Sequence, residues 1–335
     1  MSDTVVRSIT DNIFKNLSEP EFESLSLEIF RYQYENNLVY KEYVNTIGID
    51  VASISTIKEI PFLPIAFFKS HRIICEDNGV IEQMFRSSTT TNGIPSNHFV
   101  KDSSLYEHSF RKGFELFYGD AKQYSLLALL PSYLEKGDSS LVYMVDKLIA
   151  DSQNADSGFY MHNYKDLANK LRQNEKNSQK TFLIGVTYAL LKLAEEYPMD
   201  LKNTIVMETG GMKGRREELA KAEVHKILST AFNVANIHSE YGMTELLSQG
   251  YSKGKGVFSS VPWMKILIRD IYDPFRVGLI NETGAINIID LANIHSCSFI
   301  ATDDVGIISP SGDFEVAGRL DSSDIRGCNI MASGL

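Results

Sequence analysis

The chain is poor in cysteine, in long apolar runs and in positive charge. Its only cysteines are Cys75, Cys297 and Cys328, an odd number without metal-ligand spacing. The longest apolar runs, such as residues 126–130, are far too short to cross a bilayer, so we expect no membrane span. With 43 acidic and 33 basic residues, the net charge of −10 argues against a nucleic-acid partner held by general electrostatics. The N-terminus does not resemble a secretion signal, and we expect a reducing, cytoplasmic setting.

The composition otherwise predicts an ordinary globular protein. Hydrophobic residues make up 43% of the chain, enough for a substantial core, and charged residues make up 23%. At 335 residues the chain exceeds the usual size of one domain. We therefore expect either two domains or one large domain with a smaller appendage.

The N-terminal region is expected to begin with helices. Ser18 and Glu21 have the spacing of a capping box, and apolar residues then recur at helical intervals over 25–32. Two prolines in 60–64 prevent a helix from continuing there, and the apolar residues 65–68 follow. This stretch is predicted to cross the core as a buried, irregular segment.

The middle of the chain alternates short apolar runs with amphipathic helices. In chain order, the expected strands are 80–86, 126–130, 181–186, 204–207 and 234–237, and the expected helices are 141–149, 188–197 and 215–231. This order predicts an α/β fold with a mainly parallel sheet covered by helices on both faces. In such folds ligands bind beyond the carboxyl ends of the strands.

The last part of the chain is predicted to be rich in β-strands. The expected strands there are 264–268, 285–289, 299–301, 305–308 and 314–316, with turn residues between them. We therefore divide the chain into an α/β core over 1–256, a smaller β-rich subdomain over 257–318, and a C-terminal tail over 319–335.

Three segments suited to ligand binding each follow an expected strand. They are the hydroxyl-rich loop at 87–91, Gly210 with Gly211, and the heptad 239–245. The loop can wrap an anion with its hydroxyl and backbone N–H groups, or it can be an ordinary Ser/Thr-rich surface loop. The heptad combines an aromatic ring, a glycine, a hydroxyl and a carboxylate, which a nucleotide phosphate and its Mg²⁺ would require, although such residues also form ordinary turns.

Four ordered motifs resemble those of the adenylate-forming superfamily, which includes acyl-CoA synthetases. Residues 87–93 resemble its phosphate loop, although Thr89 stands where that loop normally has glycine. Residues Tyr241-Gly242-Met243-Thr244-Glu245 match its Tyr-Gly-x-Thr-Glu motif fully. Residues 302–304 resemble its Thr-Gly-Asp motif, and 318–321 resemble Gly-Arg-x-Asp.

Within the superfamily, the chain most resembles the acyl-protein synthetases of bacterial bioluminescence fatty-acid reductase complexes. The likeness is carried by residues 60–69, 302–308 and 326–330. It implies activation of a carboxylic acid, expected to be a fatty acid, as acyl-AMP with ATP and Mg²⁺. The acyl group would then pass to an enzyme cysteine and on to an acceptor protein such as a reductase or carrier.

The resemblance also implies roles for individual residues. Thr244 would bind the α-phosphate, and Glu245 would carry Mg²⁺. Tyr241 would pack on the adenine, while Asp304, assisted by Arg319, would accept from the ribose hydroxyls. The remaining cofactor-binding positions would be Ser87, Ser88, Thr89, Thr90 and Thr91 for the β- and γ-phosphates, Gly210 and Gly211 beside the adenine, and Gly242 and Met243 in the heptad.

Cys328 is the expected acyl acceptor, because the resembling family carries its nucleophilic cysteine near the C-terminus. Arg326 lies two residues before it and can favour the thiolate, although a lone cysteine is usually a small buried hydrophobe. Cys75 and Cys297, in apolar surroundings, are expected in the core.

One feature of conventional superfamily members is missing. They add a C-terminal domain whose lysine contacts the acyl phosphate, whereas this chain stops soon after residue 321. Lys213 is our candidate substitute, with a solvated surface lysine as the alternative. Two other functions remain open at this point: an acyl- or aryl-CoA ligase, and a non-catalytic nucleotide-binding subunit of a complex.

Overall fold

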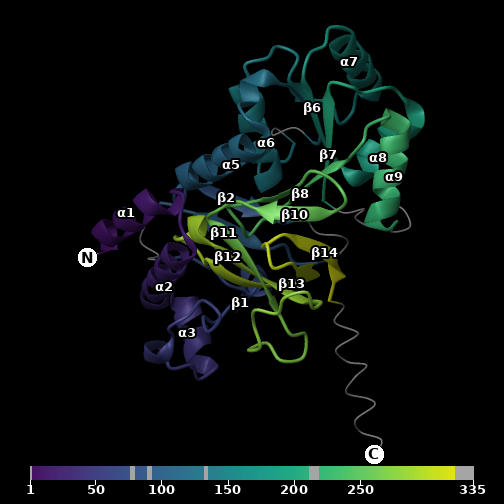
Figure 1. The fold of residues 1–335 in the computed structure, drawn as a ribbon. Helices are drawn as coiled ribbons and strands as arrows, with labels where there is room; N and C mark the ends of the chain where they lie inside the picture. The colour runs from purple at the N-terminus through teal and green to yellow at the C-terminus, as the bar shows by residue number, and fades with distance from the viewer. Residues whose placement is uncertain (1, 76–79, 89–92, 132–134, 211–218, 321–335) are drawn as a thin grey trace, which may run out of the picture.

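The computed structural model describes residues 2–75, 80–88, 93–131, 135–210 and 219–320. It has a large sheet whose strand order is β11-β12-β13-β14-β10-β9-β8-β7-β6-β4-β5, with helices packed around it. The predicted α/β class is confirmed, because half of this sheet is built from parallel strands joined through helices (Figure 1). None of the helices in the described ranges is both long enough and apolar enough to span a membrane.

Three N-terminal helices lie beside the antiparallel half of the sheet (Figure 1). They are α1 (Ser2–Ile13), α2 (Glu19–Asn36) and α3 (Leu38–Thr46). The predicted capping box is confirmed, since the Glu21 carboxylate accepts from the Ser18 backbone N–H at 2.8 Å. After the short helix η1 (Val51–Ser53), strand β1 (Leu63–Pro64) pairs with β13. The predicted crossing segment is buried over 60–63 as expected, but 64–67 are half-buried or exposed, and the segment contains β1 instead of being irregular throughout.

The parallel half of the sheet follows the predicted apolar runs. Its strands are β4 (Ser125–Leu129), β5 (Gly158–Phe159), β6 (Thr181–Val186), β7 (Thr204–Thr209) and β8 (His238–Tyr241). Every residue of β4 and β6 is buried, because helices cover both faces of these strands.

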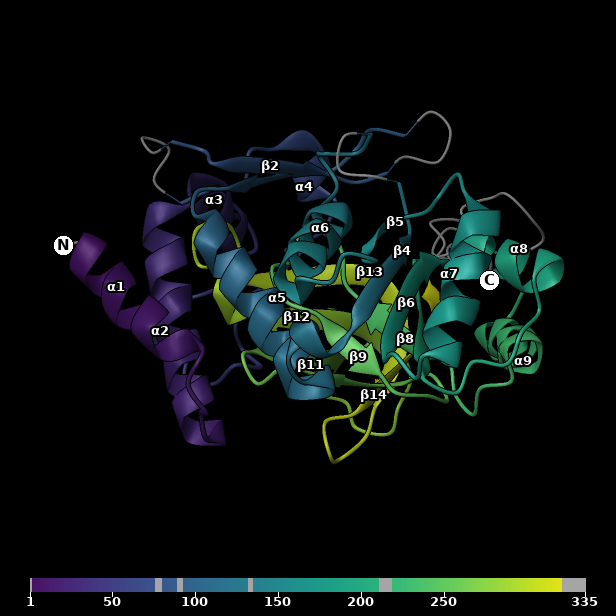
Figure 2. The ribbon, with the colours of Figure 1, turned by 90° about the horizontal axis from the view of Figure 1, so that it is seen from above.

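The helices of this half are α6 (Ser140–Ser152), α7 (Tyr164–Lys176), α8 (Thr187–Glu196) and α9 (Lys221–Phe232). Figure 2 shows α5 (Ser103–Tyr118) and α6 on one side of these strands and α7, α8 and α9 on the other. The short helix η2 (Ala121–Gln123) leads from α5 into β4.

The predicted strand at 234–237 is wrong, because the strand begins at His238. Asn233 ends α9 in a left-handed conformation, with φ of 49°, and the Val234 N–H bonds back to the Ser229 carbonyl. Residues 234–237 therefore connect the end of α9 to the start of β8. The parallel pairing with β7 starts only where Met207 faces His238.

The antiparallel half of the sheet contains β9 (Gly250–Ser252), β10 (Val257–Ser260), β11 (Met264–Arg269), β12 (Gly284–Asp290), β13 (Phe299–Ile308) and β14 (Phe314–Arg319). The separate strands predicted at 299–301 and 305–308 form one strand, β13, with a register shift at Val305/Gly306. Strand β10 pairs with both β9 and β14, so the sheet continues across residue 256. The division of the chain into three parts stays a prediction.

A separate β-hairpin lies outside the large sheet. Strand β2 (Gln83–Arg86) pairs antiparallel with β3 (Asn97–Val100), after the short helix α4 (Phe67–Ser70). The strand predicted over 80–86 thus begins at Gln83. The hydroxyl-rich segment connects these two strands.

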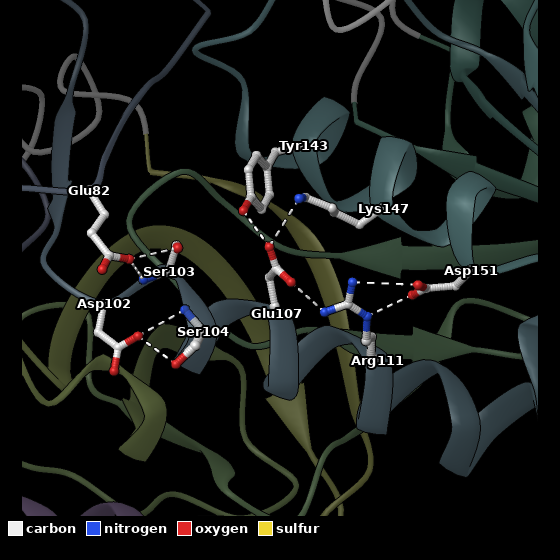
Figure 3. A network of polar contacts seen from close by, with 9 residues as sticks. All are labelled: Glu82, Asp102, Ser103, Ser104, Glu107, Arg111, Tyr143, Lys147 and Asp151. Carbon is white, nitrogen blue, oxygen red and sulfur yellow. Dashed lines mark hydrogen bonds and ion pairs between the residues drawn. The ribbon is translucent and has the colours of Figure 1, made fainter.

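An ion-paired cluster fastens α5 to α6 (Figure 3). The Glu107 carboxylate accepts from the Tyr143 hydroxyl at 2.6 Å, contacts Lys147 at 3.2 Å and also pairs with Arg111. Arg111 reaches Asp151 of α6 at 2.6 Å. Burial acts to raise the pKa of Glu107, but these three partners outweigh it and lower the pKa to about 2.

Candidate active site

The structure brings Tyr241, Asp304 and Arg319 into direct contact. The Tyr241 hydroxyl donates to one Asp304 carboxylate oxygen at 2.8 Å, and Arg319 Nε donates to the other at 2.8 Å. The pairing of β13 with β14 places Asp304 opposite Arg319, which explains how residues from separate motifs meet. Asp304 is 8% exposed and the Arg319 side chain 78% exposed, so the pair has one buried and one open end.

Tyr241 is buried by aromatic neighbours. Its ring packs edge-on against Phe258 and Phe314, with ring centroids 6.0 and 5.5 Å away. Burial raises the pKa of Tyr241, and the negative charge of Asp304 raises it further. The hydroxyl therefore stays protonated and donates to Asp304. Its predicted packing on an adenine stays a prediction.

Glu245 lies beside the base of the hydroxyl-rich loop. It is 5% exposed, and burial raises its pKa, while a hydrogen bond from the Ser96 side chain and the charges of Arg319 and Lys69 act in the opposite direction. Ser96 in turn receives a hydrogen bond from the Ser87 N–H at its carbonyl, at 3.1 Å. The residues that flank the predicted phosphate loop, Ser87 and Ser96, thus lie close to the carboxylate predicted to hold Mg²⁺.

The backbone of the turn at 241–248 is held from β3 and from the short helix η3 (Leu291–Asn293). His98 Nδ1 lies 2.8 Å from the Thr244 carbonyl oxygen, and its Nε2 lies 3.0 Å from Asn293 Oδ1. The Asn293 amide donates to the Glu245 carbonyl at 2.8 Å. Our sequence analysis did not single out either anchor, because neither belongs to a local motif.

Asp290 anchors the end of the same turn. Its carboxylate accepts from the Leu247 N–H at 2.7 Å and from the Ser248 hydroxyl at 2.6 Å. Burial raises the pKa of Asp290 to about 6, although these donors act to lower it. The turn at 241–248 is therefore held at its start through Tyr241 and at its end through Leu247 and Ser248.

Glu240 and Gly242 fit against each other at the start of the turn. The Thr209 hydroxyl donates to the Glu240 carboxyl at 2.5 Å, and burial followed by the nearby Glu208 raises the pKa of Glu240 to about 7. A Cβ at position 242 would lie 2.3 Å from Glu240 Oε1. A side chain at 242 would therefore require the Glu240 carboxylate to move, whether or not a ligand approaches the turn.

Gly210 ends β7 next to a buried charged cluster. Its φ is +71°, and no atom of the described residues lies within 4 Å of where a Cβ would be, so these residues leave the backbone open to close approach. Burial acts to raise the pKa of Glu208, but its hydrogen bond to His225 and the charge of Lys221 are among the contacts that lower it to about 2. Glu208 is therefore a charged side chain held in a fixed position near Gly210.

Several predicted site residues lie outside the described part of the chain. They are Thr89, Thr90, Thr91, Gly211, Lys213 and Cys328. Ser87 and Ser88 are described, and the Ser87 hydroxyl accepts from the Ser96 N–H at 2.9 Å. The core positions predicted for Cys75 and Cys297 are confirmed, and burial raises the pKa of Cys297 to about 12.

The donor set at the turn suits a magnesium–nucleotide complex better than a bare metal ion. No cluster of three or more His, Cys, Asp or Glu side chains suited to a metal occurs among the described residues. Mg²⁺ commonly binds through one or two carboxylates together with the phosphates of its substrate and water. A single carboxylate such as that of Glu245 fits this arrangement.

Known proteins resemble this chain in sequence. Residues 2–108 match the family model of the acyl-protein synthetase LuxE. A long-chain-fatty-acid–luciferin-component ligase from Aliivibrio fischeri is 25% identical over 93% of this chain and 88% of its own. A protein of the same name from Vibrio harveyi is 23% identical over 91% of this chain and 85% of its own.

Solved structures of adenylate-forming ligases share the fold. A 2-hydroxyisobutyryl-CoA ligase in complex with its acyl-AMP and CoA matches with a TM-score of 0.64 at 12% identity, covering 92% of this chain and 77% of that one. ATP-bound MatB from Rhodopseudomonas palustris matches with a TM-score of 0.55 at 14% identity, covering 73% of this chain and only 50% of that one. The predicted resemblance is thus confirmed: the chain is similar in sequence to the acyl-protein synthetases, and it has the fold of the adenylate-forming ligases.

Proposed function

We propose that this protein is an AMP-forming ligase that activates a fatty acid with ATP and Mg²⁺. The observation that carries the proposal is that the motifs at 241–245, 302–304 and 318–321 meet, because Asp304 contacts both Tyr241 and Arg319. Glu245 of the first motif also lies beside Ser96 at the base of the hydroxyl-rich loop. The names of the relatives in Aliivibrio fischeri and Vibrio harveyi support a long-chain fatty acid as the substrate.

In the first half-reaction, a carboxylate oxygen of the acid attacks the α-phosphorus of ATP. A new O–P bond forms, the bond to the bridging oxygen breaks, and pyrophosphate leaves with that electron pair. Bound Mg²⁺, held by Glu245 and phosphate oxygens, would neutralise part of the charge on the leaving group. The Thr244 hydroxyl would donate to the α-phosphate, and Asp304 would accept from the ribose hydroxyls while Arg319 holds that carboxylate in place.

In the second half-reaction, we propose that the Cys328 thiolate attacks the acyl carbon and AMP leaves. This forms a thioester on the protein, which a partner protein such as a reductase or carrier then accepts. The family model that matches residues 2–108 is described as an acyl-protein synthetase, which supports a protein acceptor rather than free coenzyme A. Lys213 stays our candidate for a cation near the acyl phosphate.

Pyrophosphate exchange tests the first half-reaction. The purified protein is incubated with ATP, Mg²⁺ and labelled pyrophosphate across a panel of acids, and we expect exchange only when a long-chain acid is present. ATP binding without exchange for any acid would instead indicate a non-catalytic nucleotide-binding subunit.

Labelled fatty acid tests the second half-reaction. With ATP present, we expect a hydroxylamine-sensitive label on the protein that is absent from Cys328→Ser, while Cys75→Ser keeps it. Undiminished label in Cys328→Ser would refute the carrier role alone. Thioester appearing on free coenzyme A, without label on the protein, would identify an acyl-CoA ligase.

A further inference from the structure

The imidazole of His98 joins hairpin β2–β3 to the turn at 241–248. His98 lies on β3 opposite Phe85 and is fully buried, with its ring edge-on to Phe68 at 5.8 Å between centroids. Its Nδ1 contacts the Thr244 carbonyl, 146 residues further along the chain. The hairpin that carries the hydroxyl-rich loop is therefore tied directly to the turn that carries Thr244 and Glu245.

Asn293 fixes the orientation of the ring from the opposite side. Its Nδ2 donates to the carbonyls of Glu245 at 2.8 Å and Cys297 at 3.0 Å, so its Oδ1 must face His98 Nε2. Both ring nitrogens thus face oxygen acceptors. A neutral imidazole has one N–H and can donate to only one of them at a time. Burial lowers the pKa of His98 to about 4, so the ring is neutral at neutral pH.

The turn has a fixed backbone and an available hydroxyl. The Thr244 carbonyl oxygen lies 2.8 Å from His98 Nδ1, and the Glu245 carbonyl accepts from the Asn293 amide. The Thr244 hydroxyl, in contrast, receives or donates no hydrogen bond within the described ranges, and the residue is partly exposed. A backbone fixed at 244–245, together with a Thr244 hydroxyl that has no partner among the described residues, is the arrangement expected where a ligand oxygen is bound without reorganisation.

We propose that His98 is a positioning residue of this site, which sets the placement of the Thr244–Glu245 turn relative to hairpin β2–β3 through its bond to the Thr244 carbonyl. The inference rests on the proposed function, because both segments would hold phosphates of the same nucleotide. Phosphoryl chemistry is sensitive to such placement, and a displacement of about 1 Å can cost roughly a hundredfold in rate.

Three substitutions of His98 separate its two bonds. The amide nitrogen of His98→Asn occupies roughly the place of Nδ1 and can still donate to the Thr244 carbonyl. The amide of His98→Gln reaches the place of Nε2 and can bond only Asn293, while His98→Leu can bond neither. A matched control is Asn174→Leu, which removes a buried hydrogen bond from α7 to Thr181, the first residue of β6.

Acid-dependent pyrophosphate exchange is the first readout. We expect kcat to fall about 10–100-fold in His98→Leu and His98→Gln, and to stay within about threefold of wild type in His98→Asn. The KM for the acid should stay within about threefold in all variants, since His98 is fully buried and offers the acid no accessible surface. Asn174→Leu should retain wild-type kcat, and equal kcat for His98→Asn and His98→Gln would overturn the proposal.

Amide hydrogen exchange of residues 242–248 is the second readout, and it does not depend on catalysis. We expect faster exchange there in His98→Leu and His98→Gln than in His98→Asn, with the control unchanged. If wild type exchanges no pyrophosphate with any acid, the proposed function fails and this measurement alone decides on His98. Equal protection of the turn in all His98 variants would then overturn its positioning role.

Discussion

The ion-paired cluster around Glu107 and the turn at 241–248 use polar groups in opposite ways. Glu107 is fully charged and satisfied by three partners on the half-open surface between α5 and α6. The turn is held by the neutral groups of His98 and Asn293, and no residue in the described ranges bonds the Thr244 hydroxyl. A dense polar network such as the Glu107 cluster therefore does not by itself indicate a ligand-binding site. A backbone fixed by hydrogen bonds beside a hydroxyl that no described residue bonds is the better indication.

The largest expected effect distinguishes the role of the Glu245 carboxylate from that of the Glu107 carboxylate. Glu245→Gln should lower acid-dependent pyrophosphate exchange about 10²–10³-fold, because a neutral amide cannot hold Mg²⁺ as a carboxylate does. Glu107→Gln should leave the same rate within about twofold. Comparable losses in the two variants, at equal folded fractions by circular dichroism, would contradict the assignment.

Glu240 and Glu107 should respond to pH with opposite signs. The pKa of Glu240 is raised to about 7, so its contribution to stability is complete below about 4.5 and is lost as pH rises through 7. We expect Glu240→Gln to flatten the fall in unfolding free energy between pH 5 and 8, by on the order of 2 kcal/mol because the carboxyl keeps some contact with solvent. Urea titrations across that range measure it, and an unchanged pH slope would refute the shift.

Asp304 should affect nucleotide binding more than turnover. Asp304→Asn removes the charge that pairs with Arg319 and weakens the acceptor proposed for the ribose, so we expect the KM for ATP to rise about tenfold, equivalent to roughly 1.4 kcal/mol. Asp313→Asn is the control, since Asp313 bonds Ser259 at a turn away from this pair. An ATP affinity unchanged by calorimetry would exclude Asp304 from the nucleotide site.

The smallest effect is expected for stability at the surface cluster. Glu107→Gln should lower the free energy of unfolding by about 1 kcal/mol at pH 7, because its ion pairs are partly solvated. Its depressed pKa means that this contribution is present above about 4.5 and disappears as pH falls towards 2. Wild type and variant should therefore converge in acid, and a constant difference down to pH 2 would contradict the pairing.

The sequence predicted the parallel strands well because burial on both faces leaves continuous apolar runs, as in 125–129 and 181–186. It failed where apolar residues serve another purpose: Ile237 is buried while the chain leaves α9, so 234–237 imitates a strand. It also divided β13 in two, because polar residues 302–304 interrupt the apolar pattern inside a strand whose exposed and buried faces alternate.

The motifs of the site were predictable, but their supports were not. Thr244 and Glu245 lie in one short, recognisable segment. His98 and Asn293 reach that segment from 146 and 48 residues away, and only the docking of β3 and η3 brings them there. Single buried polar residues at such separations carry no periodic or local signal, so their partners emerge only from the assembled fold.

The long-range bonds of α2 have a consequence for synthesis of the protein on the ribosome. Gln33 is buried and donates to the Asn293 carbonyl, 260 residues later, and accepts from the Ser298 N–H. At typical translation speeds this separation corresponds to on the order of 10–50 s during which the nascent helix lacks its partners. The hydrogen bonds of Gln33 to residues 293 and 298 therefore form only after η3 has been synthesised. The proposed adenylation site, which depends on η3, is accordingly among the last parts of the new chain to form.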